Sequence, residues 1–214
     1  THLMEVVKSN LPALLTLGAM QRQIEELKTL SDTGRAERYR KYFDSMIPEK
    51  VTPETLLAIL RALLEERISI RNLPLIVDAI CEFRHVEQAE TIYELVRKRL
   101  RGQITQQYSD EAGRVAALQL HPAWEAEFVR ADAETGRAGG GAMTPAMSRK
   151  LIDAVRKAMS LAEPVARTVL VAPDHRRRMV RAVLGANGVA VPVLGLEEID
   201  PSAELRLLGT VEAA

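Results

Sequence analysis

Histidine and cysteine side chains build most metal sites in proteins, and this chain offers few of them in a useful arrangement. The four histidines are widely separated, at His2, His85, His121 and His175. The single cysteine, Cys81, lies in an apolar stretch and is interpreted as a small core residue. A zinc site needs such ligands at short, regular spacing, which none of these residues has. The sequence therefore predicts no metal site and no cofactor.

The strongest catalytic candidate is His175, because it follows a predicted strand, where α/β folds often place active residues. In the more ordinary interpretation Asp174 begins a helix and His175 is solvated. The carboxylate pairs Glu65-Glu66 and Asp110-Glu111 stand at predicted helix ends without a partner base. No Ser, Cys or Thr lies in a nucleophile elbow. The sequence predicts a protein that is not an enzyme, and a hydrolase using His175 is the third alternative.

Charge argues against nucleic acid as a partner. Lys plus Arg and Asp plus Glu number 29 each, so the net charge is zero, whereas dedicated nucleic-acid binders carry a basic excess. The densest basic cluster, Arg176-Arg177-Arg178 with Arg181, is interpreted as a solvated helix face rather than a phosphate clamp. Three helices and a strand would suit a winged-helix regulator of transcription that reads DNA with residues 73–83. Asp78 and Glu82 on the outer face of that helix would repel phosphate, so this DNA-binding regulator is the runner-up hypothesis.

The first half of the chain is predicted to be helical. Aromatic residues make up only 4% of the sequence, and Leu, Ala, Val and Ile dominate, which favours a helix-rich core. Apolar residues spaced three and four apart predict helices. Thr52-Pro53-Glu54 has the preferred order of an N-cap, a first-turn proline and an early acid. The predicted helices span residues 2–31 in two stretches, 35–47, 53–66, 73–83 and 87–108.

The second half adds strands. Apolar and other residues alternate over 114–121, which indicates a half-buried strand. Gly139-Gly140-Gly141 is interpreted as a linker. Strand, helix and strand in succession predict a small α/β lobe with a right-handed crossover. The predicted strands are 114–121, 168–171, 189–194 and 205–211, and the predicted helices are 122–130, 144–162 and 173–184.

The predicted fold class is mainly α with a small α/β lobe, a multi-subdomain α+β protein. Three parts are expected: a helical tail of a first subdomain at 1–34, a helical subdomain with one strand at 35–135, and a small α/β subdomain at 136–214. No apolar run approaches the roughly 20 residues that a bilayer requires, and no signal peptide is recognisable. The chain begins at Thr1 and not at Met, which suggests a soluble piece of a longer protein.

Three segments of the chain resemble one family. Thr1-His2-Leu3 looks like the family's ATHL entry to a helix, and residues 65–73 look like its EGVSIRDL segment. Residues 102–108 look like its GRQI-QQY helix end, and the order, the spacing and the ending 207–211 agree. On these residues the chain resembles the C-terminal cytoplasmic part of the export-gate protein of bacterial type III secretion, most closely the flagellar FlhA family. Asn72 departs from the family pattern, which usually has Asp.

The resemblance implies a docking and ring module of a protein export gate. It implies a multispanning membrane part elsewhere in the full-length protein and a soluble part at the cytoplasmic face of the bacterial inner membrane. The implied partners are export chaperone–substrate complexes, soluble components of the export ATPase complex, and further copies of the chain in a nine-membered ring. Nucleic acid is not among them. The substrates would pass on to the membrane export pore.

A ring needs heterologous contacts, in which one patch of a subunit matches a different patch of its neighbour. A chain rich in both charge signs suits such polar interfaces. We place one protein-binding patch at Glu66, Arg67, Arg71 and Asn72, in a link between predicted helices. The equal alternative is that Arg71 and Asn72 cap and brace the next helix. By the resemblance, Thr1 corresponds to the edge of the family's chaperone cleft.

Overall fold

The computed structural model describes residues 10–135, 143–163 and 167–213. The chain divides into two compact units, Thr1–Leu100 and Arg101–Ala214, called here the N-terminal unit and the C-terminal unit. Within the described ranges, no helix has the combination of length and apolarity that a bilayer crossing demands. Thr1 lies outside the described residues.

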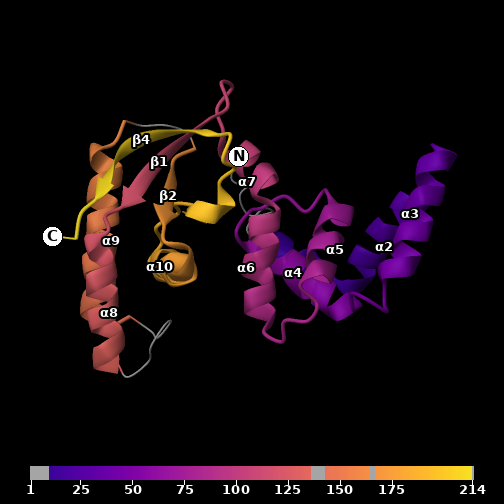
Figure 1. Cartoon of the computed structure of the whole chain (residues 1–214), viewed down its shortest axis with the longest axis horizontal. Coiled ribbons are helices and arrows are strands. Elements are labelled where there is room, and N and C mark those ends of the chain that lie inside the picture. The colour runs from indigo at the N-terminus through magenta and orange to yellow at the C-terminus, as the bar shows by residue number, and fades with distance from the viewer. Residues whose placement is uncertain (1–9, 136–142, 164–166, 214) are drawn as a thin grey trace. The chain divides into compact units, whose positions relative to one another are not determined.

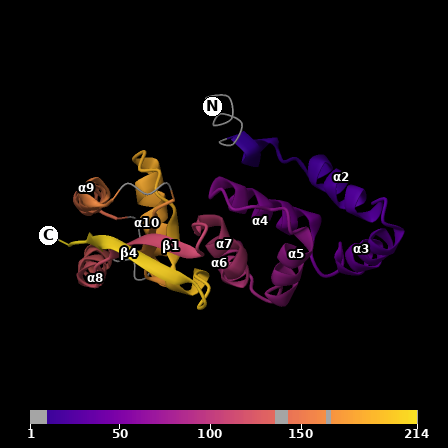
Figure 2. The same ribbon diagram turned by 90° about the horizontal axis from the view of Figure 1, so that it is seen from above.

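Helices alone build the described part of the N-terminal unit, and side-chain caps begin four of them. Thr16, Asp32, Thr52 and Asn72 each accept a hydrogen bond from the backbone amide three residues ahead. Helices α4, α5 and α6 lie together (Figure 2), and their apolar faces, which include Leu60, Ile76 and Val96, are fully buried. The helices are α2 (Leu17–Lys28), α3 (Thr33–Met46), α4 (Pro53–Glu65), α5 (Leu73–Glu82) and α6 (Ala89–Arg99).

The single helix predicted over 87–108 is wrong, because the structure breaks it at Leu100 into α6 and α7 (Arg101–Tyr108). Leu100 has a ψ of 7°, and its amide donates to the carbonyls of both Val96 and Arg97. Its side chain is fully buried. Leu100 and its neighbours Arg99 and Arg101 are all good helix formers, so apolar spacing alone could not locate the break.

The C-terminal unit is an α/β lobe around one parallel sheet. The strand order is β3-β2-β1-β4, and every pairing is parallel. Figure 1 shows β1 and β4 side by side, with α8 and α9 nearby. The elements after α7 are β1 (Arg114–Leu120), α8 (Ala123–Thr135), α9 (Pro145–Leu161), β2 (Val169–Ala172), α10 (Asp174–Ala186), β3 (Val193–Gly195), the short 3-10 helix η1 (Leu196–Glu198) and β4 (Glu204–Val211).

Three helices bury their apolar faces in one cluster with the sheet. Trp124 and Phe128 of α8 stack with ring centroids 5.7 Å apart, and the Trp124 indole donates to the carbonyl of Val211 over 2.9 Å. Leu151 of α9 and Val180 of α10 join the same cluster. The lobe therefore has a continuous hydrophobic core of its own.

The predicted fold class is confirmed: the protein is mainly α with a small α/β lobe. The division of the structure differs from the predicted boundary after residue 135. Strand β1, which the sequence analysis assigned to the helical subdomain, is a central strand that pairs with both β2 and β4. Alternating apolar residues predict a strand but not its pairing partners, which lie far away in the sequence. The third strand is also shorter than predicted, because only Val193–Gly195 pairs with β2.

Candidate functional site

The link between α4 and α5, residues 66–72, has a backbone conformation that is unusual for its sequence. Arg67 has a φ of 59°, in the left-handed region that favours glycine. The amide of Arg67 donates to the carbonyl of Leu64, and the amide of Ile68 donates to that of Leu63. These two bonds form a Schellman C-cap, in which buried Ile68 packs behind the turn. The exposed Arg67 therefore occupies a left-handed backbone conformation that glycine adopts with the least strain.

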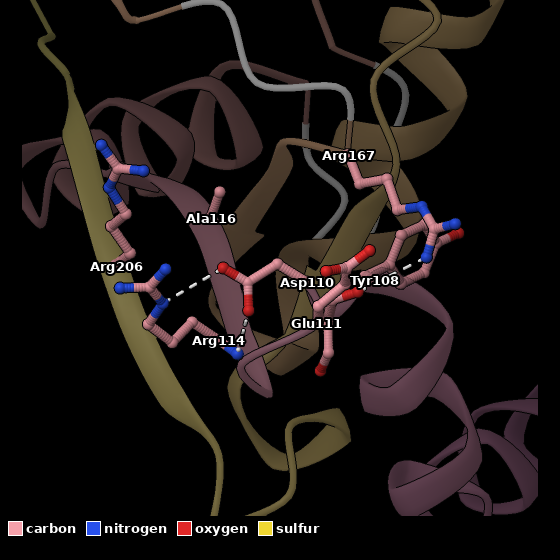
Figure 3. Close-up of a pocket in the computed structure, with 8 residues that line it drawn as sticks. Tyr108, Asp110, Glu111, Arg114, Ala116, Arg167 and Arg206 are labelled. Carbon is pink, nitrogen blue, oxygen red and sulfur yellow. Dashed lines mark hydrogen bonds and ion pairs between the residues drawn. The ribbon is translucent and has the colours of Figure 1, made fainter.

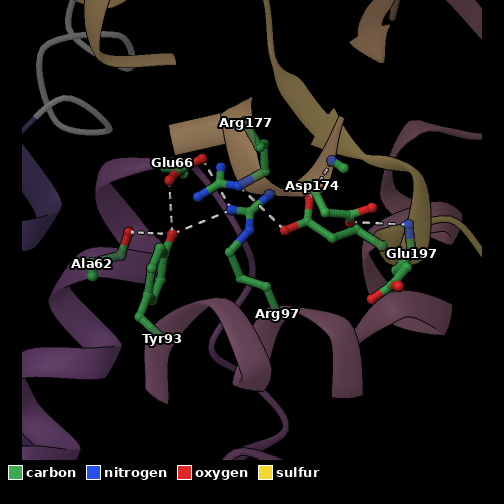
Figure 4. A network of polar contacts seen from close by, with 9 residues as sticks. Ala62, Glu66, Tyr93, Arg97, Asp174, Arg177 and Glu197 are labelled. Atoms are coloured by element: carbon green, nitrogen blue, oxygen red, sulfur yellow. Dashed lines mark hydrogen bonds and ion pairs between the residues drawn. The ribbon is translucent and has the colours of Figure 1, made fainter. Parts of the chain in front are cut away.

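Glu66 is held inside the N-terminal unit by a polar network (Figure 4). Its carboxylate accepts from the Tyr93 hydroxyl and from the Arg97 guanidinium, over 3.0 Å in each case. The Tyr93 hydroxyl also lies 3.2 Å from the carbonyl of Ala62. Arg97 is only 1% exposed, so this contact neutralises a buried cation. The network ties the end of α4 to α6 and thereby fixes the start of the link.

The remaining residues of the predicted patch are exposed. Asn72 caps α5 by accepting from the amide of Leu75 over 3.4 Å, so the bracing alternative describes part of its role. The amide of Arg71 donates to the Ser69 hydroxyl, and the Arg71 side chain extends into solvent. The structure thus places Arg67, Arg71 and Asn72 on one short exposed link, with Glu66 beneath it.

The arginine cluster of α10 is only in part the solvated face that the sequence predicted, because Arg178 is exposed but Arg176 and Arg177 are buried. Arg176 and Arg177 are 4% and 1% exposed. Arg176 contacts Glu125 over 2.9 Å and Asp132 over 2.7 Å, and its guanidinium lies 5.4 Å from the centroid of the Phe128 ring. The hydrogen bonds from Arg176 hold the pKa of the Glu125 carboxyl below its ordinary value. Because acids on α8 receive this cation, the positive charge of Arg176 cannot serve as a phosphate clamp.

Arg177 forms a second buried pair in the same unit. Its Nε lies 3.4 Å from Oε1 of Glu198, which is itself 1% exposed. The other carboxylate oxygen of Glu198 accepts from the amide of Gly195 over 3.0 Å. Next to this pair, Asp174 accepts from the amide of Glu197 (Figure 4). These contacts fasten the start of α10 to the turn after β3.

A cavity of about 370 Å³ lies at the amino ends of the strands in the C-terminal unit (Figure 3). Its polar groups are largely engaged with one another. Arg114 pairs with Asp110 over 3.1 Å, and the backbone amide of Arg114 is the main cause that lowers the pKa of Asp110. Arg167 donates to the carbonyls of Gln107 and Ser109. The cavity is lined by Tyr108, Ser109, Asp110, Glu111, Arg114, Ala116, Arg167 and Arg206.

The candidate catalytic groups do not assemble into a reactive site. The Ser109 hydroxyl donates to the carbonyl of Thr105. His175 is 63% exposed and lies 3.2 Å from Glu125, whose carboxylate also binds Arg176. Across the described parts of the chain, no group of three or more His, Cys, Asp and Glu residues could hold a metal ion.

The helices and the parallel sheet together define a mainly α protein with a small α/β lobe. The model of the FHIPEP family matches residues 1–204, and the chain belongs to this family. This confirms the resemblance to the export-gate family that the three sequence segments carried. The parallel pairing of β1 with both β2 and β4 argues against the winged-helix regulator, because it makes β1 a central strand and not part of a wing.

Two curated relatives are flagellar biosynthesis proteins FlhA. The chain is 30% identical over 213 residues to the one from Caulobacter vibrioides and 26% identical over 217 residues to the one from Helicobacter pylori. Each match covers 99% of this chain but only 29% and 28% of the relative. The chain therefore spans less than a third of the length of these proteins.

Solved structures with a similar fold include one of EPEC SctV-C and one of a Chlamydia pneumoniae complex of CdsV and CdsO. The nonameric SctV-C of EPEC has a TM-score of 0.78 at 20% identity, and the match covers 98% of this chain and 61% of that one. The CdsV chain of the Chlamydia pneumoniae CdsV and CdsO protein complex has a TM-score of 0.76 at 22% identity, with 99% and 59% covered. At these identities the likeness shows the fold.

Sequence reasoning missed the two buried arginines of α10. For Arg176, the signal is the pair of acids Glu125 and Asp132, which lie seven residues apart on one face of α8. A matching pair of acids on a neighbouring helix offsets the cost of burying an arginine only when the two helices pack together. That packing is decided by the tertiary structure.

Proposed function

We propose that this chain is a docking and ring module in the cytoplasmic part of a flagellar type III export gate. It would receive chaperone-bound substrates at the inner membrane and hand them to the export pore, without catalysing a reaction. The single observation that carries the proposal is membership of the FHIPEP family together with curated relatives that are flagellar biosynthesis proteins. The nonameric state of a solved structure of similar fold supports assembly into a ring.

Within this function, the link 66–72 is the contact surface. Arg67 and Arg71 present two exposed cations, and the buried contact between Glu66 and Arg97 keeps their backbone in place. Retaining an arginine in the left-handed conformation costs roughly 1 kcal/mol relative to glycine. Such strain is common at binding sites, where the side chain is needed despite its cost to folding. The partner surface would be acidic, either on the next subunit or on a chaperone or ATPase component.

The proposal is tested by titrating the chain with an export chaperone that is loaded with its substrate, and in parallel with duplex DNA. We expect saturable binding to the loaded chaperone and none to DNA. Arg71→Glu should weaken the chaperone complex at least about tenfold, because it reverses a charge at the interface. Arg149→Glu, an exposed arginine of α9, is the matched control and should leave the affinity unchanged.

Binding to DNA alone would overturn the export function in favour of a DNA-binding regulator. Equal losses in Arg71→Glu and Arg149→Glu would show that general charge, and not the link, carries the contact. A loss confined to Arg71→Glu would support the link as the docking surface.

A further inference from the structure

Strand β4 is an edge strand whose first half is open to solvent. Among the described strands it pairs with β1 alone. Leu208 and Val211 in its second half pack into the hydrophobic core, whereas residues 204–207 are all exposed. A strand edge of this kind presents unpaired N–H and C=O groups, which are a template for another strand. The edge therefore has the backbone chemistry for β-pairing.

The side chains of this edge alternate in a regular way. Glu204 and Arg206 point to one face of the sheet, and Leu205 and Leu207 point to the other. Figure 3 shows Arg206 and Arg114 lining the same cavity, and the strand register places Arg206 opposite Ala116 and Glu204 opposite Arg114. Leu205 and Leu207 are 42% and 56% exposed, so the other face of this strand presents two apolar side chains to solvent.

We propose that this edge pairs with the same edge of a second copy of the chain, antiparallel and centred on Leu205. A two-fold axis through that position brings Glu204 opposite Arg206 of the second copy, and the reverse pair forms by symmetry. Directly opposed side chains lie roughly 5 Å apart, so both ion pairs are within reach. On the other face, the two copies of Leu205 meet, with Leu207 opposite Ala203. Residues 203–207 of one copy are therefore complementary to residues 203–207 of the second copy, both in charge and in apolar contact.

Charge selects this register over its neighbours. A two-fold axis at Glu204 would place two carboxylates opposite each other, and one at Arg206 would place two guanidinium groups opposite each other. An axis at Leu207 would oppose Arg206 to Leu208 and form no ion pair. Like charges directly opposed destabilise a strand pair, whereas opposite charges stabilise it. Register is well specified where such differences exist.

The present contact of Arg206 does not block the pairing. Its guanidinium binds Glu163, but both side chains are largely exposed, at 44% and 64%. An exposed ion pair of this kind contributes roughly 0–1 kcal/mol, so Arg206 can exchange Glu163 for Glu204 of a second copy at little cost. Natural edge strands are often protected by charges of one sign, which repel a second copy. Here the charges alternate in sign, which removes that protection.

The contact would be weak and dependent on concentration. The overlap is confined to residues 203–207, because the chain turns at Ser202. Such a short overlap falls below the ~1,200 Å² that stable interfaces bury. It joins chains across a two-fold axis, whereas a ring needs heterologous contacts, so it lies outside the proposed ring surface and does not depend on the proposed function.

The first test is sedimentation of the full 214-residue chain over a concentration series into the millimolar range. We expect reversible dimers. Arg206→Glu should raise the dissociation constant at least about tenfold, because two attractive pairs become repulsive. Glu204→Arg should do the same. An equimolar mixture of these two variants should form heterodimers at least as readily as the unchanged chain, because every opposed pair is then attractive.

The second test fixes the register by disulfide formation in a Cys81→Ser background. Leu205→Cys should form a covalent dimer on mild oxidation, because the two copies of that residue are opposed. Leu207→Cys is the matched control on the same strand face. In the proposed register its two copies are offset by four residues, roughly 13 Å, which is beyond the reach of a disulfide.

The pairing is overturned if Arg206→Glu and Glu204→Arg leave the dissociation constant of the dimer unchanged. It is also overturned if their equimolar mixture does not dimerise as readily as the unchanged chain. Cross-linking through Leu207→Cys in preference to Leu205→Cys would overturn the register. A chain that stays monomeric throughout the series also refutes the proposal. Arg71→Glu should leave these dimers intact, so loss of chaperone docking and loss of edge pairing are separable.

Discussion

The buried contact between Arg176 and the two acids of α8 makes the sharpest prediction about stability. The guanidinium makes hydrogen bonds of 2.9 Å to Glu125 and 2.7 Å to Asp132, and the three side chains are 5%, 37% and 14% exposed. In Arg176→Ala both carboxylates lose this partner. Removing one member of a buried ion pair costs about 3–5 kcal/mol. Water reaches Glu125, so its share is smaller, and we expect a loss of about 2–3 kcal/mol in the free energy of unfolding.

Urea denaturation followed by tryptophan fluorescence measures this loss of stability in the C-terminal unit. Trp124 is the only tryptophan in the chain, is fully buried and stacks on Phe128, so its emission reports on the C-terminal unit. Arg149→Ala is the matched control, because Arg149 is exposed on α9. It should change the free energy of unfolding by no more than about 0.5 kcal/mol.

Two further variants separate charge from packing. Arg176→Met keeps an apolar stem against Phe128 but still leaves the acids unpaired, so it should be nearly as destabilising as Arg176→Ala. Adding Glu125→Gln and Asp132→Asn to Arg176→Met removes the two orphaned charges and should recover part of the loss. The reasoning is refuted if Arg176→Ala unfolds within about 0.5 kcal/mol of the Arg149→Ala control.

Three other predictions follow from single contacts. Arg176 lowers the pKa of Glu125 in the folded state, so the unfolded state binds more protons than the folded state as the pH falls. The free energy of unfolding of the C-terminal unit should therefore decline below about pH 4.3 in urea titrations followed by fluorescence, and it should decline less in Arg176→Ala. Arg67→Gly should stabilise the N-terminal unit by about 1 kcal/mol in urea titrations followed by tyrosine fluorescence, because glycine adopts the positive φ without strain. Tyr42→Phe should cost about 1 kcal/mol in denaturation followed by far-UV circular dichroism, because it removes the hydroxyl hydrogen bond to Asp78.

Each of these predictions has a contrary outcome. An equally steep acid loss in Arg176→Ala would show that other carboxylates carry the pH dependence. A destabilised Arg67→Gly would mean that contacts of the arginine side chain outweigh the backbone strain. If Arg67→Gly is more stable yet binds the loaded chaperone less well, glycine at this position favours folding whereas arginine favours docking.

The sequence by itself determined where most helices begin. The side-chain cap at Thr52 is a local hydrogen bond between residues three apart, so the order Thr52-Pro53-Glu54 alone predicts it. Apolar spacing likewise identified the buried faces of α4 and α5. Three short segments were enough to identify the family, which the match over residues 1–204 confirms.

Tertiary structure alone decided the rest. The central position of β1 and the burial of Arg176 each depend on residues far away in the sequence, and no local pattern contains that information. The exposed edge of β4 has the same origin. Its alternation of charge and leucine is visible in the sequence, but only the strand order shows that this alternation faces solvent. Local propensity sets the elements, whereas the packing of their apolar faces sets which polar groups are buried and which are presented to a partner.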